Sequence, residues 1–239
     1  MFMGIAMGNF IEMLLRFLHF FFGVMWIGHL YYFNFTQGTF LNDAEIAAGS
    51  KTDLRRKLLP AALYYFRWGA MWTVVTGVLY WSYKAHTSGA GFNVFLQSSY
   101  GWTITSGMIL GLIMWYNVWF VIWPKQQIVI KNAEGLAKSQ PANPDAAAAG
   151  ARANVASRTN TLFSIPLLYL MGAASHFPLP VSERTNYCIF WIPFLLIVAA
   201  LEWNALKGQT RKIMTTIPQV VHFGILLTII IIGLMFAAV

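Results

Sequence analysis

RFLHFFFGVMWIGHLYYFN, residues 16–34, is apolar and aromatic enough to cross a membrane as a helix. It nevertheless holds two of the chain's five histidines, His19 and His29. An imidazole is costly to place in hydrocarbon, so a histidine inside a span normally faces a protein interior and a partner there. We therefore treat these two histidines as functional candidates, and we interpret the helix as one that presents one or both imidazoles to a haem.

The composition of the whole chain indicates a membrane protein. Of the 239 residues, 58% are hydrophobic and 10% are charged, whereas soluble domains carry about 25% charged residues. Several apolar runs reach about 20 residues, the length of a helix that crosses a bilayer. The net charge of +8 comes from short connections between these runs, so we expect no nucleic-acid partner. A single cysteine, Cys188, excludes an internal disulfide.

These patterns predict an all-α polytopic membrane helix bundle that forms one domain over residues 1–239. We expect about six spans, at about 11–36, 59–83, 100–123, 158–177, 186–206 and 213–237. The polar segment 43–58 is compatible with a short interfacial helix. The longest polar connection, 125–157, holds small residues and two prolines, and we predict a flexible cytoplasmic loop there.

The distribution of Lys and Arg predicts the orientation of the bundle. Twelve, among them Lys207, Arg211 and Lys212, lie in the connections after the first, third and fifth spans, and three lie on the opposite side. Because Lys and Arg accumulate in cytoplasmic loops, both termini should face outward. In the inner membrane of a bacterium that side is the periplasm.

The depth of each histidine in its span suggests two haem-ligand pairs. With a rise of about 1.5 Å per residue, His29 and His222 both fall in the inner half, and His19 and His176 fall in the outer half. A haem b with two axial imidazoles at each depth would suit electron transfer across the bilayer, so we expect one or two haem b groups, with His19, His29 and His222 as the main iron ligands. Alternatively, each imidazole simply hydrogen-bonds a neighbouring carbonyl.

Two charged residues lie within predicted spans at similar depth. Arg67 and Glu202 could form an ion pair, the usual solution for intramembrane charge. The functional alternative is that Arg67 binds a haem propionate, because a guanidinium suits carboxylate recognition.

Four segments resemble the membrane domain of bacterial urate oxidases of the urate hydroxylase type. They are WIGHLYYFNF (26–35), LLPAALYYFRWGAMWTVVTGVLY (58–80), MWYNVWFVIWPKQQ (114–127) and SRTNTLFSIPLLY (157–169). The resemblance covers about 10–177. It implies a multi-helix membrane part that works with a periplasmic cytochrome c. The sequence holds no Cys-x-x-Cys-His for attached haem c, so the electron acceptor would be another subunit.

A more distant similarity is to the four-helix bacterial membrane protoporphyrinogen oxidases. The matching residues are His19, Trp26, Gly28 and Tyr31, and later Arg158, Asn160 and Pro166. The similarity implies haem b on His19. That family has an important lysine in its third span, whereas this sequence has Thr105 and Ser106 in that region. A different reaction is therefore expected.

Three hypotheses for function remain. The first is a haem b electron-transfer protein, a subunit of a larger redox or respiratory hetero-oligomer with cytochrome c or other redox partners. The second is a membrane enzyme that oxidises urate or another purine and reduces a cytochrome c, with a pocket of planar and polar groups, namely Tyr31, Tyr32, Asn34, Tyr64, Tyr65, Arg67 and Asn117. The third is a cofactor-free accessory subunit, in which the histidines are satisfied core groups.

Overall fold

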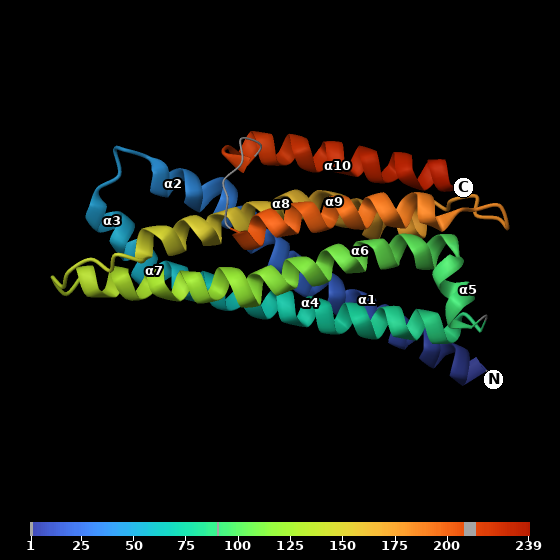
Figure 1. The fold of residues 1–239 in the computed structure, drawn as a ribbon. Helices are drawn as coiled ribbons and strands as arrows, with labels where there is room; N and C mark the ends of the chain where they lie inside the picture. The colour runs from blue at the N-terminus through green and yellow to red at the C-terminus, as the bar shows by residue number, and fades with distance from the viewer. Residues whose placement is uncertain (1, 90, 208–213) are drawn as a thin grey trace.

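A computed structural model describes residues 2–89, 91–207 and 214–239, and the side chains from residue 7 onward within these ranges. The described residues form helices and connections and contain no strand, which confirms the predicted all-α class (Figure 1). Arg211 and Lys212 lie outside the described residues. The elements are α1 (Phe2–Tyr31), η1 (Tyr32–Gln37), α2 (Gly38–Asn42), α3 (Ala48–Asp53), η2 (Leu54–Leu58), α4 (Leu59–Thr87), α5 (Phe92–Gln97), α6 (Ser99–Tyr116), η3 (Asn117–Ile122), α7 (Trp123–Leu136), α8 (Ala146–His176), α9 (Tyr187–Lys207) and α10 (Ile217–Ala238).

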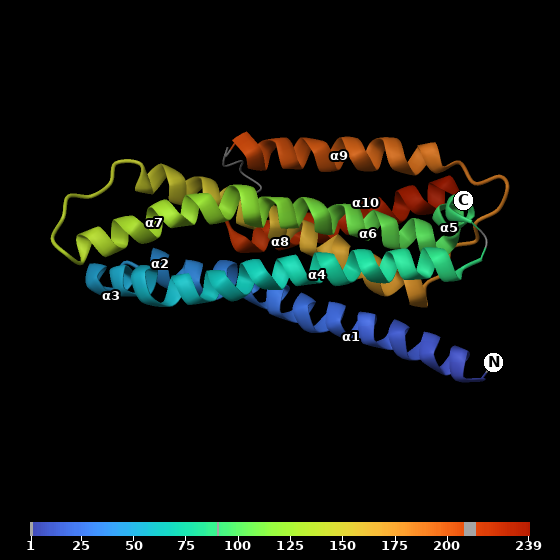
Figure 2. The same cartoon turned by 90° about the horizontal axis from the view of Figure 1, so that it is seen from below.

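The long helices run side by side, and α8 lies at the centre of the bundle. It packs against α6, α7, α9 and α10, whereas α1 packs mainly against α4 (Figures 1 and 2). Most side chains of α8 between Ala153 and Leu170 are buried. Both termini lie at the same end of the bundle, opposite α3 and the end of α7 (Figure 1). Helix α1 diverges from the other helices toward its N-terminus (Figure 2).

Glycines allow α10 to pack closely on α8 and α4 to pack closely on α1. A Cβ at Gly224 of α10 would lie 2.5 Å from the side chain of Ile165 on α8 and 3.0 Å from a backbone oxygen. A Cβ at Gly69 of α4 would lie 3.1 Å from the backbone nitrogen of Trp26 on α1. Small residues at helix contacts are the usual basis of tight packing in membranes.

Four helical segments are long and apolar enough to cross a membrane. They are Met7–Asn42, Ser99–Leu136, Tyr187–Lys207 and Ile217–Ala238. The predicted spans at 59–83 and 158–177 form helices, α4 and α8, that are not among these four. Helix α8 carries hydroxyl and amide side chains between Ser157 and Ser164. These side chains are buried against other helices.

The prediction of a flexible loop over 125–157 is wrong for most of that segment. Helix α7 continues to Leu136 and α8 begins at Ala146, so only the short connection between them is non-helical. The small residues form helices because alanine has the highest helix propensity, and Ile130, Ala133, Ala149 and Ala153 are buried. The prolines at 141 and 144 fall in the connection. In segment 43–58, a helix does form, as α3 and η2.

Candidate functional site

Two π-helical segments face the polar stretch of α8. Segments η1 and η3 both pack against α8, and π-helical turns inside α-helices are frequent at functional sites. The polar stretch is a set of hydroxyl and amide side chains that are 9% exposed or less, namely Ser157, Thr159, Asn160, Thr161 and Ser164. This arrangement makes the centre of the bundle a candidate site.

The first side of this site is formed by η1 and the end of α1. Asn34 of η1 donates from Nδ2 to Ser157 Oγ at 2.8 Å, and the hydroxyl of Tyr31 lies 2.9 Å from Ser164 Oγ. Asn34 Nδ2 also donates to the carbonyl of Leu30 at 2.9 Å. These contacts fix the position of α1 against α8 through polar groups on both helices.

The second side is a chain of hydrogen bonds that ends at a carboxylate. Asn160 Nδ2 donates to the carbonyl of Met114 at 2.9 Å, which leaves Asn160 Oδ1 as an acceptor. Asn117 Nδ2 then donates to Asn160 Oδ1 at 3.0 Å and to Glu202 Oε2 at 2.9 Å. We call Asn160, Asn117 and Glu202 the amide–carboxylate chain. Asn117 Oδ1 and Glu202 Oε1 are buried and have no hydrogen-bond partner among the described residues.

The predicted ion pair between Arg67 and Glu202 does not form. The Arg67 guanidinium carbon lies 3.9 Å from the ring centre of Trp123 and 4.9 Å from that of Trp119. Arg67 therefore faces η3 and the start of α7, whereas Glu202 binds Asn117. Similar depth in two spans does not fix which way each side chain points around its helix. Arg67 Nε and Trp119 Nε1 are buried donors with no acceptor among the described residues.

His19 is held between α1 and α4. Its Nδ1 lies 2.9 Å from the carbonyl oxygen of Thr73, and its ring lies against Gly77. A Cβ at Gly77 would lie 2.8 Å from His19 Cε1, so the bare glycine makes room for the imidazole. A ring nitrogen beside a carbonyl carries the proton. Nε2 is then left with its lone pair and has no hydrogen bond in the described part of the chain.

His29 has the same arrangement at a different level. Its Nδ1 lies 2.7 Å from the carbonyl oxygen of Met25, and its ring stacks on Tyr65 of α4 at 6.2 Å. Both contacts match the alternative that an intramembrane imidazole bonds a carbonyl. They also match the usual state of a metal-binding histidine, whose second nitrogen donates to a carbonyl or carboxylate.

The other predicted ligands lie elsewhere. His222 is exposed on α10, and His176 is exposed at the end of α8. Helix α10 packs against α8 and α9, whereas α1 packs against α4 and α8, so the structure does not bring His222 against His29. His176 likewise has no contact with His19 in the described ranges. Those ranges also contain no group of three or more His, Cys, Asp or Glu side chains that could hold a metal ion.

The residues predicted to form a purine pocket divide into separate groups. Tyr31, Asn34 and Asn117 face α8, Arg67 lies on two indole rings, and Tyr64 and Tyr65 are each 53% exposed. The described cavities lie elsewhere and are lined mostly by apolar groups. One of them is an open apolar groove between α8, α9 and α10, lined by Leu162, Ile197, Leu201, Phe223, Leu226, Leu227 and Ile230.

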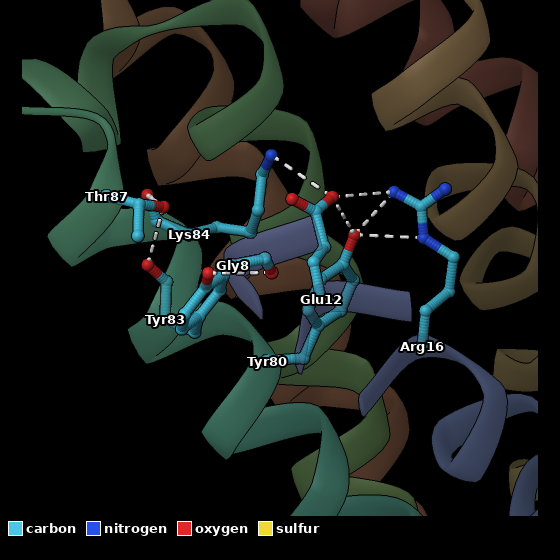
Figure 3. Close-up of polar contacts among 7 residues, drawn as sticks. All are labelled: Gly8, Glu12, Arg16, Tyr80, Tyr83, Lys84 and Thr87. Carbon is cyan, nitrogen blue, oxygen red and sulfur yellow. Dashed lines mark hydrogen bonds and ion pairs between the residues drawn. The ribbon is translucent and has the colours of Figure 1, made fainter. Parts of the chain in front are cut away.

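A charged cluster joins α1 to α4 near the N-terminus (Figure 3). Arg16 donates from Nη2 to Glu12 Oε1 at 3.1 Å and to the Tyr80 hydroxyl at 2.6 Å. The same Glu12 oxygen accepts from Tyr80 at 3.2 Å and from Lys84 at 3.4 Å. We call Glu12, Arg16, Tyr80 and Lys84 the ionic cluster. The sequence signal for it was the spacing of Glu12 and Arg16, four residues apart on one helix.

Comparison with known proteins identifies a family. The family described as "Urate oxidase N-terminal" matches residues 89–233, which is more than half of the chain. The match includes the third and fourth of the segments on which the resemblance rested, and it extends through α9 into α10. No curated protein and no solved structure matches the chain.

Proposed function

This chain belongs to the urate oxidase N-terminal family, and from that premise we propose that it is a haem b-binding membrane subunit that transfers electrons within a larger redox complex. In this proposal all six long helices cross the membrane. Four of these helices are apolar enough to cross a membrane on their own. The other two are α4 and α8, whose polar side chains face protein.

The observation that carries the proposal is the state of the two imidazoles on α1. His19 and His29 each place Nδ1 against a backbone carbonyl, which leaves Nε2 as a lone-pair donor. Ten residues separate them, about 15 Å along the helix, so they would serve two separate haems. A haem supplies a one-electron centre whose potential depends on its axial ligands. The residues of α1 would bind it and set that potential.

Each haem would take a second axial ligand from outside α1. The sequence predicted His222 and His176 for this role, but the bundle does not bring them against the imidazoles of α1, so a partner subunit would supply the ligand. Arg67 is the candidate for a propionate because its Nε has no acceptor among the described residues. The partner that receives the electrons is a cytochrome c or another redox subunit. The shared end of the two termini would face the periplasm, since the basic residues of 51–57 and 125–138 lie at the other end.

The test is a pyridine haemochrome assay with a redox difference spectrum on the purified full chain. We expect one or two haem b per chain, and a loss or a high-spin change in His19→Ala and in His29→Ala. His86→Ala is the matched control, because His86 is exposed at the end of α4 and should leave the spectrum unchanged. His222→Ala and His176→Ala in the same assay test whether either predicted ligand contributes to haem binding. A purified chain without haem would contradict the proposal and favour the cofactor-free accessory subunit.

A second candidate function, oxidation of urate or another purine with electrons passed to a cytochrome c, is supported by the surroundings of Arg67. Two buried donors there, Arg67 Nε and Trp119 Nε1, have no acceptor in the described part of the chain, and an anionic planar substrate would offer one. Urate-dependent reduction of cytochrome c by membranes containing the chain would support this function, provided that Arg67→Gln lowers it. No reduction with the partner cytochrome present would exclude it.

A further inference from the structure

Glu202 is a carboxylate within a helix apolar enough to cross a membrane, and no cation of the described residues pairs with it. Its Oε2 accepts one hydrogen bond, from Asn117 Nδ2 at 2.9 Å, and its Oε1 is buried without a partner. The ion pairs among the described residues involve Glu12 and Asp53 and none involves Glu202. An ionised carboxylate in a dry interior is unfavourable unless it is paired and hydrogen-bonded.

In residues 99–207 and 214–239, the charged groups on the elements around Glu202 are exposed or make other contacts. Segment 99–122, which includes Asn117, contains no charged residue or histidine. On α10, His222 is exposed. The cations on α8 and α9 make other contacts, namely Arg158 Nη1 to Met214 O at 2.6 Å, Arg152 to the carbonyl of Leu206, and Lys207 over Trp203 at 4.7 Å.

Asn117 gives Glu202 a single neutral hydrogen-bond donor, which offsets only part of the cost of burying a charge. Its side chain is fully buried, and both described contacts of its amide use Nδ2 as a donor. The orientation is imposed from the far end of the amide–carboxylate chain, because Asn160 Nδ2 donates to Met114 O and so turns Oδ1 toward Asn117. One neutral amide donor leaves the second oxygen of an ionised carboxylate unsolvated. Protonation removes that charge, turns Oε1 into an O–H donor, and leaves Oε2 free to keep the hydrogen bond from Asn117.

We propose that Glu202 is a proton-binding site of the bundle, in which one proton from water binds Oε1 while Oε2 accepts the hydrogen bond from Asn117. Binding converts a carboxylate of charge −1 into a neutral acid and involves no electron transfer. Glu202 is half-buried and lies five residues before the end of α9 at Lys207. A proton can therefore reach it from the membrane surface at that end. The site does not depend on haem.

Carbodiimide labelling tests this proposal on the full chain in detergent. Dicyclohexylcarbodiimide is apolar and reacts with protonated carboxyl groups, so peptide mass spectrometry should find Glu202 modified and Glu12 unmodified. The matched control is the double variant Arg16→Gln with Lys84→Gln. It removes both cations from Glu12, so Glu12 should become reactive, which shows that the reagent reaches an intramembrane carboxyl in this protein.

Infrared spectroscopy decides the case in which the reagent does not reach Glu202. The wild type should show the carbonyl stretch of a protonated acid, shifted in D₂O and absent from Glu202→Gln. If the two spectra are the same in this region, Glu202 is ionised and the proposal is wrong. If Na⁺ removes the band and protects Glu202 from labelling, Asn117 Oδ1 and Glu202 Oε1 hold a cation instead. That result would also overturn the proposal.

Discussion

Glu12 and Glu202 are both carboxylates on helices long and apolar enough to cross a membrane, but their surroundings differ. Glu12 of α1 lies beside two cations and a tyrosine hydroxyl of the ionic cluster (Figure 3). Glu202 of α9 has one amide donor and an unpartnered oxygen. A carboxylate paired with cations, like Glu12, holds two helices together. A carboxylate without a paired cation, like Glu202, is a candidate for proton binding, because its ionised form is unfavourable inside the bundle.

The largest expected effect is at the amide that orients the Glu202 region. Asn160→Ala removes one of the donors to the Met114 carbonyl, leaves one donor direction of Asn117 unsatisfied and opens a small cavity. We expect a loss of about 2–4 kcal/mol in the free energy of unfolding in detergent. Asn93→Ala, on an exposed side chain, is the control and should change it by less than about 0.5 kcal/mol. If both variants changed the free energy of unfolding by similarly small amounts, the amide–carboxylate chain would contribute nothing to stability.

In the ionic cluster, Glu12→Gln removes the negative charge that faces two cations. Because the side chains of Arg16 and Lys84 are 42% and 30% exposed, solvent screens much of the effect, and we expect a loss of about 1 kcal/mol. Glu134→Gln on the exposed face of α7 is the matched control. The loss should shrink in high salt, since exposed ion pairs are screened. A salt-independent loss would point to packing instead.

Lys84→Gln should have a smaller effect than Glu12→Gln. The Lys84 Nζ to Glu12 Oε1 distance is 3.4 Å, and Glu12 keeps Arg16 and Tyr80 when Lys84 is removed. We expect a loss of about 0.3 kcal/mol. A double-mutant cycle with Arg16→Gln measures the coupling between the two cations. A cost as large as that of Glu12→Gln would show that Lys84 is the main partner.

The sequence predicted the fold class and the positions of the long helices, because these depend on apolar length and composition. It predicted 125–157 incorrectly because small residues are ambiguous. The same alanines suit a flexible loop or a helical hairpin, and the buried contacts of Ile130 and Ala153 decide for helix. The π-helical segments η1 and η3 were also not foreseen, since nothing in their residue types departs from an α-helical pattern.

The candidate site was predictable in part. The sequence placed Arg67 and Glu202 at similar depth, but the direction of a side chain depends on helix rotation and packing. Trp119 and Trp123 surround the guanidinium, and Asn117 reaches the carboxylate. The buried polar run of α8 was quoted only for its family resemblance, although a run of polar residues in a central span is itself a signal.

Replacing Glu202 with glutamine should have the smallest effect on stability. It also compares the two carboxylates directly, because Glu12→Gln is the same change in the ionic cluster. Glutamine keeps an oxygen that can accept from Asn117 Nδ2, and it has the shape and the neutrality of the protonated acid. If Glu202 is protonated, Glu202→Gln should change the free energy of unfolding by less than about 0.5 kcal/mol, while Glu12→Gln is destabilising. Thermal unfolding of both variants in one detergent checks this. A loss at Glu202 as large as that at Glu12 would mean that its charge is compensated, and the two carboxylates would then belong to one class.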